Sequence, residues 1–158
     1  MKTYLLSKRI TNSVKLKIVF VFAFYLVMTF SSQGQSILGK WKTIDDETGR
    51  EKSIVELYKE DGKIFGKVVK LLLPEDQGKL CEKCEGAEHN KPIEGMVIVK
   101  NMELDDDNTY EDGTIFDPKK GKKYTCKMWI EDDEPNKLNV RGYIAFLYRT
   151  QYWYRVTE

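Results

Sequence analysis

The chain has 158 residues, with 26 Lys or Arg, 25 Asp or Glu and a formal net charge of +1 at pH 7. The first 34 residues hold five of the basic side chains and no acidic one, so the remaining 124 residues carry a net charge of −4. This charge argues against nucleic acid or an anionic membrane surface as the main partner. A length of 124 residues fits one domain that can fold around a single core without a metal.

Residues 1–34 are predicted to be a secretory signal peptide that is cleaved from the chain. A basic, acid-free start is followed by an apolar run at 18–30, which is too short for a comfortable membrane span. Small and polar residues follow, and cleavage after Gly34 would leave Gln35 first. We therefore expect an exported protein without stable membrane insertion. An uncleaved N-terminal anchor is the alternative interpretation.

The mature part, residues 35–158, is predicted to consist of strands and turns, with no helix longer than a turn or two. Alternating apolar and polar residues between turn signals indicate seven or eight strands. Asp61-Gly62 gives the strongest hairpin signal, because glycine accepts the positive φ of a tight turn. Gly66 suggests a bend or bulge within a strand. The predicted strands lie at residues 36–45, 52–60, 63–72, 94–102, 110–116, 122–131, 137–143 and 146–156.

Side-chain alternation also predicts which face of each strand points inward. On the strand at 122–131, Tyr124, Cys126, Met128 and Ile130 are expected to face the core. Two other strands have a consistent apolar face, formed by Ile64, Val68 and Leu72 in one and by Met96, Ile98 and Met102 in the other.

Consecutive strands joined by short turns favour an antiparallel up-and-down meander. About eight strands are enough to close a barrel with a small lumen, and closure removes exposed strand edges. The expected fold class is therefore all-β, a single closed barrel.

The two ends of the mature chain carry a pattern that closes many ligand-holding barrels. Gly39 and Trp41 lie on the first predicted strand, and Arg149 and Arg155 share one face of the last. A guanidinium stacked on an indole can seal the narrow end of such a barrel as a cation–π pair. The sequence does not decide which arginine packs on Trp41; Arg155 is taken with Gly39 and Trp41 as the closure set.

Motifs along the whole mature chain resemble one known family, the exported bacterial proteins called domain of unknown function 2147. The match lies in the order of individually weak motifs. These are Gly39-x-Trp41, Cys81-x-x-Cys84-x-Gly86, Pro92-x-x-Gly95, Asp112-Gly113-x-Ile115-x-Asp117-Pro118-x-x-Gly121-Lys122-x-Tyr124, Leu138-x-Val140-x-Gly142-Tyr143 and Arg149-Thr150-Gln151-x-Trp153-x-Arg155.

The resemblance implies a calycin-type, lipocalin-like barrel in a bacterial periplasm or secreted outside the cell. It implies no catalytic residues, because the biochemical activity of the family is not established.

The last strand carries the candidate ligand site. Its two faces are unusually polar and aromatic for a plain core, and a small-molecule site needs apolar walls with a few placed donors. We expect Arg149 and Gln151 to meet the polar end of a ligand, with Tyr124, Met128 and Trp153 as walls. Alternatively, these residues belong to the closed end and the surface.

Three cysteines leave an odd thiol in an exported protein. Cys81 and Cys84 lie in a polar loop, where a local disulfide is the plainest interpretation. A redox-active pair is a second one. With His89 the spacing supplies three potential zinc ligands, and Cys126 or a carboxylate would have to be the fourth.

No motif supports a catalytic set. The acidic run at 105–108 lacks the glycine and glutamate of a calcium loop, and residues 113–122 lack the spacing of a phosphate-binding loop. A single histidine leaves no nucleophile–histidine pair to defend. We expect a non-enzymatic protein without cofactor or metal that binds a small, partly apolar ligand. The alternatives are an envelope structural or interaction protein with a filled barrel, and a thiol or zinc module.

Overall fold

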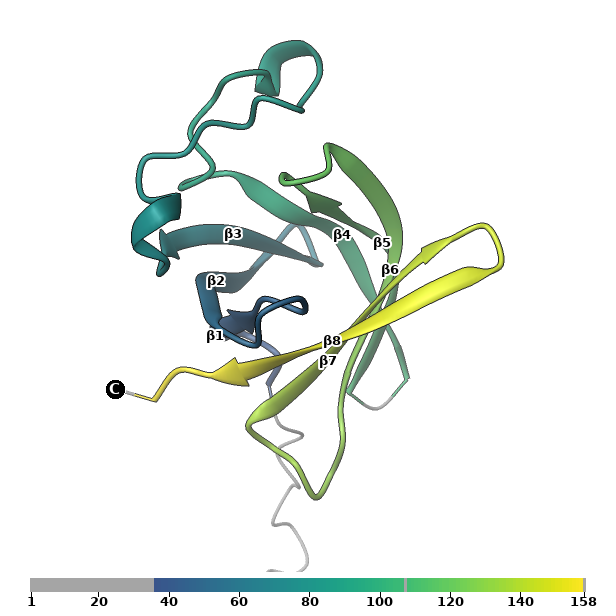
Figure 1. The fold of residues 1–158 in the computed structure, drawn as a ribbon. Coiled ribbons are helices and arrows are strands. Elements are labelled where there is room, and N and C mark those ends of the chain that lie inside the picture. The colour runs from purple at the N-terminus through teal and green to yellow at the C-terminus, as the bar shows by residue number, and fades with distance from the viewer. Residues whose placement is uncertain (1–35, 107, 158) are drawn as a thin grey trace, which may run out of the picture. The chain divides into compact units, whose positions relative to one another are not determined.

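The computed structural model describes residues 36–106 and 108–157, and the predicted signal peptide lies outside these residues. The described residues form eight strands, each antiparallel to the next, and the last pairs with the first to close a barrel (Figure 1). The predicted fold class is confirmed. The strands are β1 Gly39–Ile44, β2 Glu51–Glu60, β3 Lys63–Leu71, β4 Val97–Asp106, β5 Thr109–Asp117, β6 Lys122–Ile130, β7 Lys137–Ile144 and β8 Leu147–Arg155.

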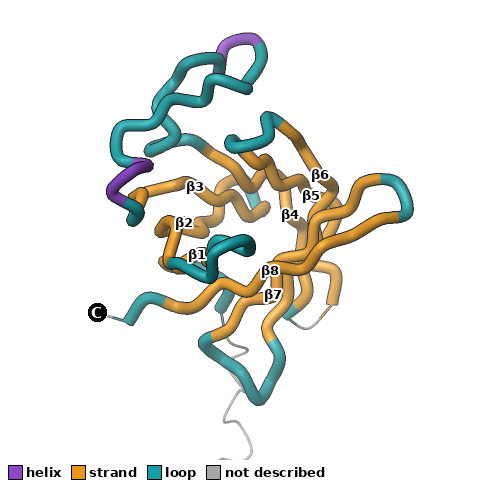
Figure 2. The backbone as a smooth tube through the Cα atoms, in the orientation of Figure 1, coloured by secondary structure: helices purple, strands orange, loops and turns teal. Residues whose placement is uncertain are grey.

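Short turns join most strands, and one long loop joins β3 to β4 (Figure 2). Two 3₁₀ turns, η1 Pro74–Asp76 and η2 Gly86–Glu88, lie in that loop. No helix in the described part of the chain has the length and apolar character to cross a bilayer.

The fourth strand begins and ends later than the sequence predicts. The prediction placed it at 94–102, and the structure places it at Val97–Asp106. The Glu94 carboxylate accepts the backbone N–H of Leu71 at 2.7 Å, and Gly95 has a φ of +88°. The turn at Glu94 and Gly95 is thus held to the end of β3, and β4 starts only after it, at Val97.

A bulge in β3 changes the face of its last residues. Val55 pairs with Val68 but Ile54 pairs with Lys70, so one residue of β3 is left unmatched. A slip of one residue exchanges the two faces of a strand. Leu71 is therefore buried where the alternation predicted Leu72. On β4 and β6 the predicted inward residues are buried or half-buried.

Gly66 lies where neighbouring side chains leave no room for a Cβ. A Cβ built there would lie 2.7 Å from Cδ2 of Leu57 and 2.9 Å from Cβ of Val99. The pairing of β3 with β4 shifts on both sides of Gly66, as the sequence led us to expect of a bend. Leu57 and Val99 thereby fill the lumen at this level.

Trp41 and Arg155 lie together at one end of the barrel. They are paired residues of β1 and β8, and the guanidinium carbon lies 4.2 Å from the centroid of the buried indole ring. The indole Nε1 donates to the carbonyl of Ile37 at 2.8 Å. Arg155 donates to the carbonyls of Ser36 and Leu38, at 2.8 and 3.2 Å. The guanidinium thus ties the chain that precedes β1 across the end of the barrel.

Large side chains fill the half of the barrel next to this stack. Several of them are essentially inaccessible to solvent, which indicates a packed core with no room for a ligand. They are Trp41, Val55, Leu57, Val99, Met102, Met128 and Leu138.

Replacing Arg155 by Met should destabilise the barrel. The variant loses the cation–π contact and two hydrogen bonds, and we expect the free energy of unfolding to fall by about 1–3 kcal/mol. Urea unfolding followed by circular dichroism measures this. Arg149→Met is the matched control, because Arg149 makes an exposed ion pair on the same strand, and such pairs contribute at most about 1 kcal/mol. Equal losses in the two variants would contradict the role given to Arg155.

Candidate functional site

The barrel contains a cavity of about 660 Å³ at the end away from Trp41. Antiparallel strands bring the end of β1 and the start of β2 to this end, together with the β3–β4 loop, the β5–β6 turn and the β7–β8 turn. In Figure 1 the β3–β4 loop and the β5–β6 turn lie at the top, and the β6–β7 turn lies at the bottom. We call the cavity end the mouth and the Trp41 end the closed end.

The inner wall of the cavity is mostly apolar. Most of its side chains are buried or half-buried members of the strands, and two small hydroxyls join them. Thr43 and Ser53 face each other across the β1–β2 ladder, and their oxygens lie 2.7 Å apart in a hydrogen bond. The apolar wall is formed by Val68, Leu71, Ile93, Ile98, Ile115, Phe116, Val140 and Trp153.

The mouth is ringed by charged side chains whose formal charges cancel. Seven basic and seven acidic described residues line it, so the ring has little net field with which to attract an ion. The basic ones are Arg50, Lys52, Lys79, Lys83, Lys119, Lys120 and Arg149, and the acidic ones are Asp45, Asp46, Glu47, Glu75, Asp76, Glu82 and Asp117.

Ion pairs hold the β1–β2 loop to three other parts of the mouth. Glu47 pairs with Lys119 of the β5–β6 turn at 2.9 Å, and Arg50 pairs with Glu75 of η1 at 2.6 Å. Asp46 pairs with Arg149 of β8 at 3.0 Å. Each exposed pair contributes little by itself. Together they fix where this loop crosses the mouth.

Asp45 orders the same loop from within. Its Oδ1 accepts from the hydroxyl and the backbone N–H of Thr48, at 2.9 and 3.0 Å. The Thr48 hydroxyl is the main cause that lowers the pKa of the Asp45 carboxyl below its ordinary value, although burial opposes it. In the same way, Lys119 lowers the pKa of Glu47. Both carboxylates are therefore ionised acceptors at neutral pH.

The structure brings four of the five predicted ligand-binding residues to the cavity. Tyr124, Arg149, Gln151 and Trp153 line it. Met128 does not: it is fully buried in the packed half and is not a lining residue. The alternation of side chains correctly predicted that Met128 faces the inside of the barrel. However, Met128 lies further along β6 toward the closed end than Tyr124, so it does not reach the cavity.

The polar groups of Arg149 and Gln151 both interact with the carboxylate of Asp46. It pairs with the guanidinium of Arg149, and the Gln151 amide donates to the same carboxylate oxygen. The prediction from sequence missed this competitor, because Asp46 follows the first predicted strand and is about a hundred residues from Arg149 and Gln151 in sequence. It also missed Thr43 and Ser53, which alternation along their strands could have placed on the inner face.

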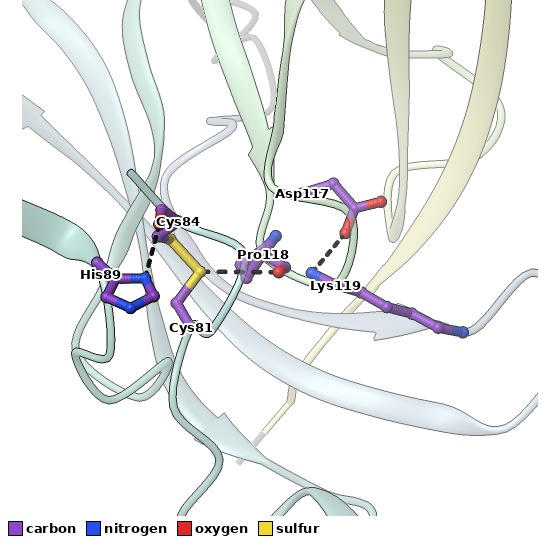
Figure 3. The surroundings of a disulfide bond; sticks show 6 residues. All are labelled: Cys81, Cys84, His89, Asp117, Pro118 and Lys119. Carbon is purple, nitrogen blue, oxygen red and sulfur yellow. Dashed lines mark hydrogen bonds between the residues drawn. A yellow bond between two sulfur atoms is a disulfide. The ribbon is translucent and has the colours of Figure 1, made fainter. Parts of the chain in front are cut away.

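Cys81 and Cys84 form a disulfide, as the plainest interpretation of the sequence predicted. Figure 3 shows the bond beside the β5–β6 turn, with Cys81 Sγ 3.7 Å from the carbonyl of Pro118. His89 lies on the other side, with Nδ1 3.0 Å from the Cys84 carbonyl oxygen. Because both sulfurs are bonded to each other, neither is a thiolate that could bind zinc.

The disulfide loop also packs closely on the mouth. A Cβ at Gly121 would lie 2.1 Å from the carbonyl oxygen of Lys83, and Gly121 has a φ of +66°. Only glycine fits there without moving the backbone. The β5–β6 turn, which carries Lys119, is thus supported from behind by the disulfide loop.

Cys126 is a free, buried thiol on the inner face of β6. Burial raises the pKa of this thiol to about 12. Below that pH it is protonated, so it is a poor nucleophile and a poor metal ligand. Within the described residues, no group of three or more His, Cys, Asp or Glu side chains could hold a metal ion.

Fold and cavity together define a class: a closed eight-stranded antiparallel barrel, sealed at one end and open at the other, of the lipocalin-like kind. A family model described as "Uncharacterized protein conserved in bacteria (DUF2147)" matches residues 39–155, and the chain belongs to this bacterial family. The resemblance found in the sequence motifs is confirmed.

Among solved structures, the barrel is similar to protein HP1028 from the human pathogen Helicobacter pylori, which is described as belonging to the lipocalin family. The TM-score is 0.68 at 16% sequence identity, and the alignment covers 78% of this chain and 84% of that chain. At this identity the likeness shows the fold alone. A comparison with curated proteins finds no match.

Thiol counting tests the cysteine assignments. In the native protein without reductant, we expect no thiol to react with Ellman's reagent at pH 8, because Cys126 is buried and its pKa is about 12. Denaturant should expose one thiol, and denaturant with reductant should expose all three cysteines. Three reactive thiols in denaturant alone would contradict the disulfide, and metal analysis of the same sample tests the zinc interpretation.

Proposed function

We propose that this protein is an exported, non-enzymatic binder of a small, partly apolar molecule, which it holds in the barrel. The observation that carries the proposal is the cavity of about 660 Å³ with an apolar inner wall. Ligand pockets in proteins have volumes of roughly 300–1,000 Å³ and are lined mostly by apolar side chains. A barrel filled by its own side chains, the alternative from the sequence, would leave no such space.

The binding energy comes mainly from removing apolar surface from water. The walls formed by Val68, Ile98, Ile115 and Val140 offer such surface, and each Å² of apolar area buried contributes about 25 cal/mol. The closed end prevents water from entering behind the ligand, because Trp41 and the packed half of the barrel block that route.

The polar end of the ligand stays at the mouth, where Arg149 and Gln151 orient it. Arg149 is a half-exposed guanidinium that lines the cavity, and guanidinium groups bind carboxylates through paired hydrogen bonds. Asp46 pairs with this guanidinium, so a ligand carboxylate has to share Arg149 with Asp46 or displace it.

Two features support the non-enzymatic and exported parts of the proposal. The free thiol, Cys126, has a raised pKa, and His89 lies against the disulfide loop and does not line the cavity. The Cys81–Cys84 disulfide fits an oxidising compartment, such as a bacterial periplasm. Native mass spectrometry of the protein purified from its own host would reveal a co-purified small molecule.

Blocking the cavity should abolish binding. Ile115→Trp places a large ring inside the cavity and should remove most of the fluorescence enhancement of anilinonaphthalene sulfonate, a general apolar probe. Lys123→Trp adds the same ring on the outside of the neighbouring strand and should leave the titration unchanged. Equal binding by the two variants, with both folded by circular dichroism, would place the probe elsewhere on the protein.

Arg149 and Asp46 should have opposite effects on a carboxylate ligand. We expect Arg149→Ala to weaken the binding of undecanoate by about threefold to tenfold, because it removes one charge-assisted hydrogen-bonding partner. Asp46→Asn removes the competing anion and should strengthen binding. Calorimetric titration with undecanoate measures both effects. Unchanged affinity in Arg149→Ala would remove this residue from the site.

A further inference from the structure

Trp153 is a wall residue of the cavity, and its indole nitrogen has no hydrogen-bond partner among residues 36–106 and 108–157. Its side chain is only 2% exposed. The other two tryptophans differ: the Nε1 of Trp41 donates to Ile37 and that of Trp129 donates to Glu131. Buried polar groups in native proteins nearly always have partners, so this indole N–H needs an explanation.

The register places Trp153 at the base of the cavity. Trp41 lies on β1 at the closed end, where it pairs with Val55 of β2 and with Arg155 of β8. Two residues nearer the mouth, Thr43 pairs with Ser53 and Trp153. Thr43, Ser53 and Trp153 therefore form the first level above the closed end, and all three line the cavity.

This level can donate hydrogen bonds but carries no charge. One of the Thr43 and Ser53 hydroxyls donates to the other, and the one that accepts keeps its own O–H for a further acceptor. The indole N–H of Trp153 can only donate. Every charged lining residue lies in a loop of the mouth or within three residues of a strand end there.

These properties determine which kind of ligand group is favoured at the base of the cavity. An acceptor oxygen would satisfy the Trp153 N–H, whereas a hydrocarbon end would leave it unpaired. A carboxylate or ammonium group at this level would lose its hydration without gaining an ionic partner.

We propose that the cavity binds molecules whose buried end carries an uncharged acceptor oxygen, such as a ketone, ester or amide carbonyl. The Trp153 Nε1–H donates to this oxygen, and any charged group of the ligand stays at the mouth near Arg149. This inference rests on the proposed binding function. Neighbouring atoms cover the Trp153 nitrogen, so contact requires a small movement of the indole or of the wall beside it.

Three probes of matched chain length separate the possibilities: 2-undecanone, undecane and undecanoate. In ¹⁵N–¹H spectra of the full barrel, the three tryptophans give three indole signals, and the variant Trp153→Phe assigns the one of interest. We expect 2-undecanone to shift the Trp153 proton signal downfield and to slow its exchange with solvent. Undecane and undecanoate should bind without this downfield shift, and the Trp41 and Trp129 signals are internal controls.

Affinities give a second measurement. Trp153→Phe keeps an aromatic wall but removes the N–H, so it should weaken 2-undecanone by about threefold to tenfold more than it weakens undecane. Displacement of anilinonaphthalene sulfonate from each protein measures the four affinities.

The outcomes separate this inference from the function on which it rests. If 2-undecanone displaces the dye but leaves the Trp153 signal in place, the ketone does not accept from the N–H and the inference is overturned, while cavity binding stands. If undecanoate shifts that signal as the ketone does, the restriction to uncharged groups is wrong. If none of the three probes displaces the dye, binding in the cavity itself fails and the inference fails with it.

Discussion

The stack of Arg155 on Trp41 is the contact on which the rest of the barrel depends. A sheet closes only if its first and last strands pair, and here the β1–β8 ladder has only three registered residue pairs. The guanidinium adds a cation–π contact, 4.2 Å from the ring centroid, and hydrogen bonds to the chain that leads into β1. These contacts reinforce the short ladder between the first and last strands of the barrel, and they seal the same end against water.

Sealing one end divides the lumen into two parts with different roles. Next to the stack, large side chains such as Leu57, Met102 and Met128 pack to the density of a core and provide stability. Toward the mouth, apolar wall residues surround the open cavity. The mouth itself is shaped by contacts between loops, including the three ion pairs of the β1–β2 loop and the disulfide loop behind the β5–β6 turn. The proposed binding function requires this division, because a ligand site has to be hollow without weakening the closed sheet.

Much of this arrangement could be predicted from the residues, and the failures have definite causes. Alternation predicted the inward faces of β4 and β6, and turn signals separated all eight strands. The Leu72 prediction failed because a bulge adds one residue to β3 and exchanges the faces. Met128 was placed on the right face but at the wrong level, since alternation does not say how far along the barrel a ligand reaches. Asp46 was missed because its contacts with Arg149 and Gln151 join segments about a hundred residues apart in sequence.

The sequence by itself determined the strand order, the closed antiparallel topology and the family, because these depend on local periodicity, turn chemistry and the order of short motifs. It favoured the Cys81–Cys84 disulfide but left a redox-active pair and a zinc site as alternatives. It also limited the sealing cation to two arginines on one strand face. Only the tertiary structure decided that Arg155 stacks on Trp41 while Arg149 lies at the mouth, because this choice depends on the register of β8 against β1. The same register places Trp153 at the base of the cavity. That its indole N–H is covered and has no hydrogen-bond partner among the described residues also depends on contacts between residues distant in sequence.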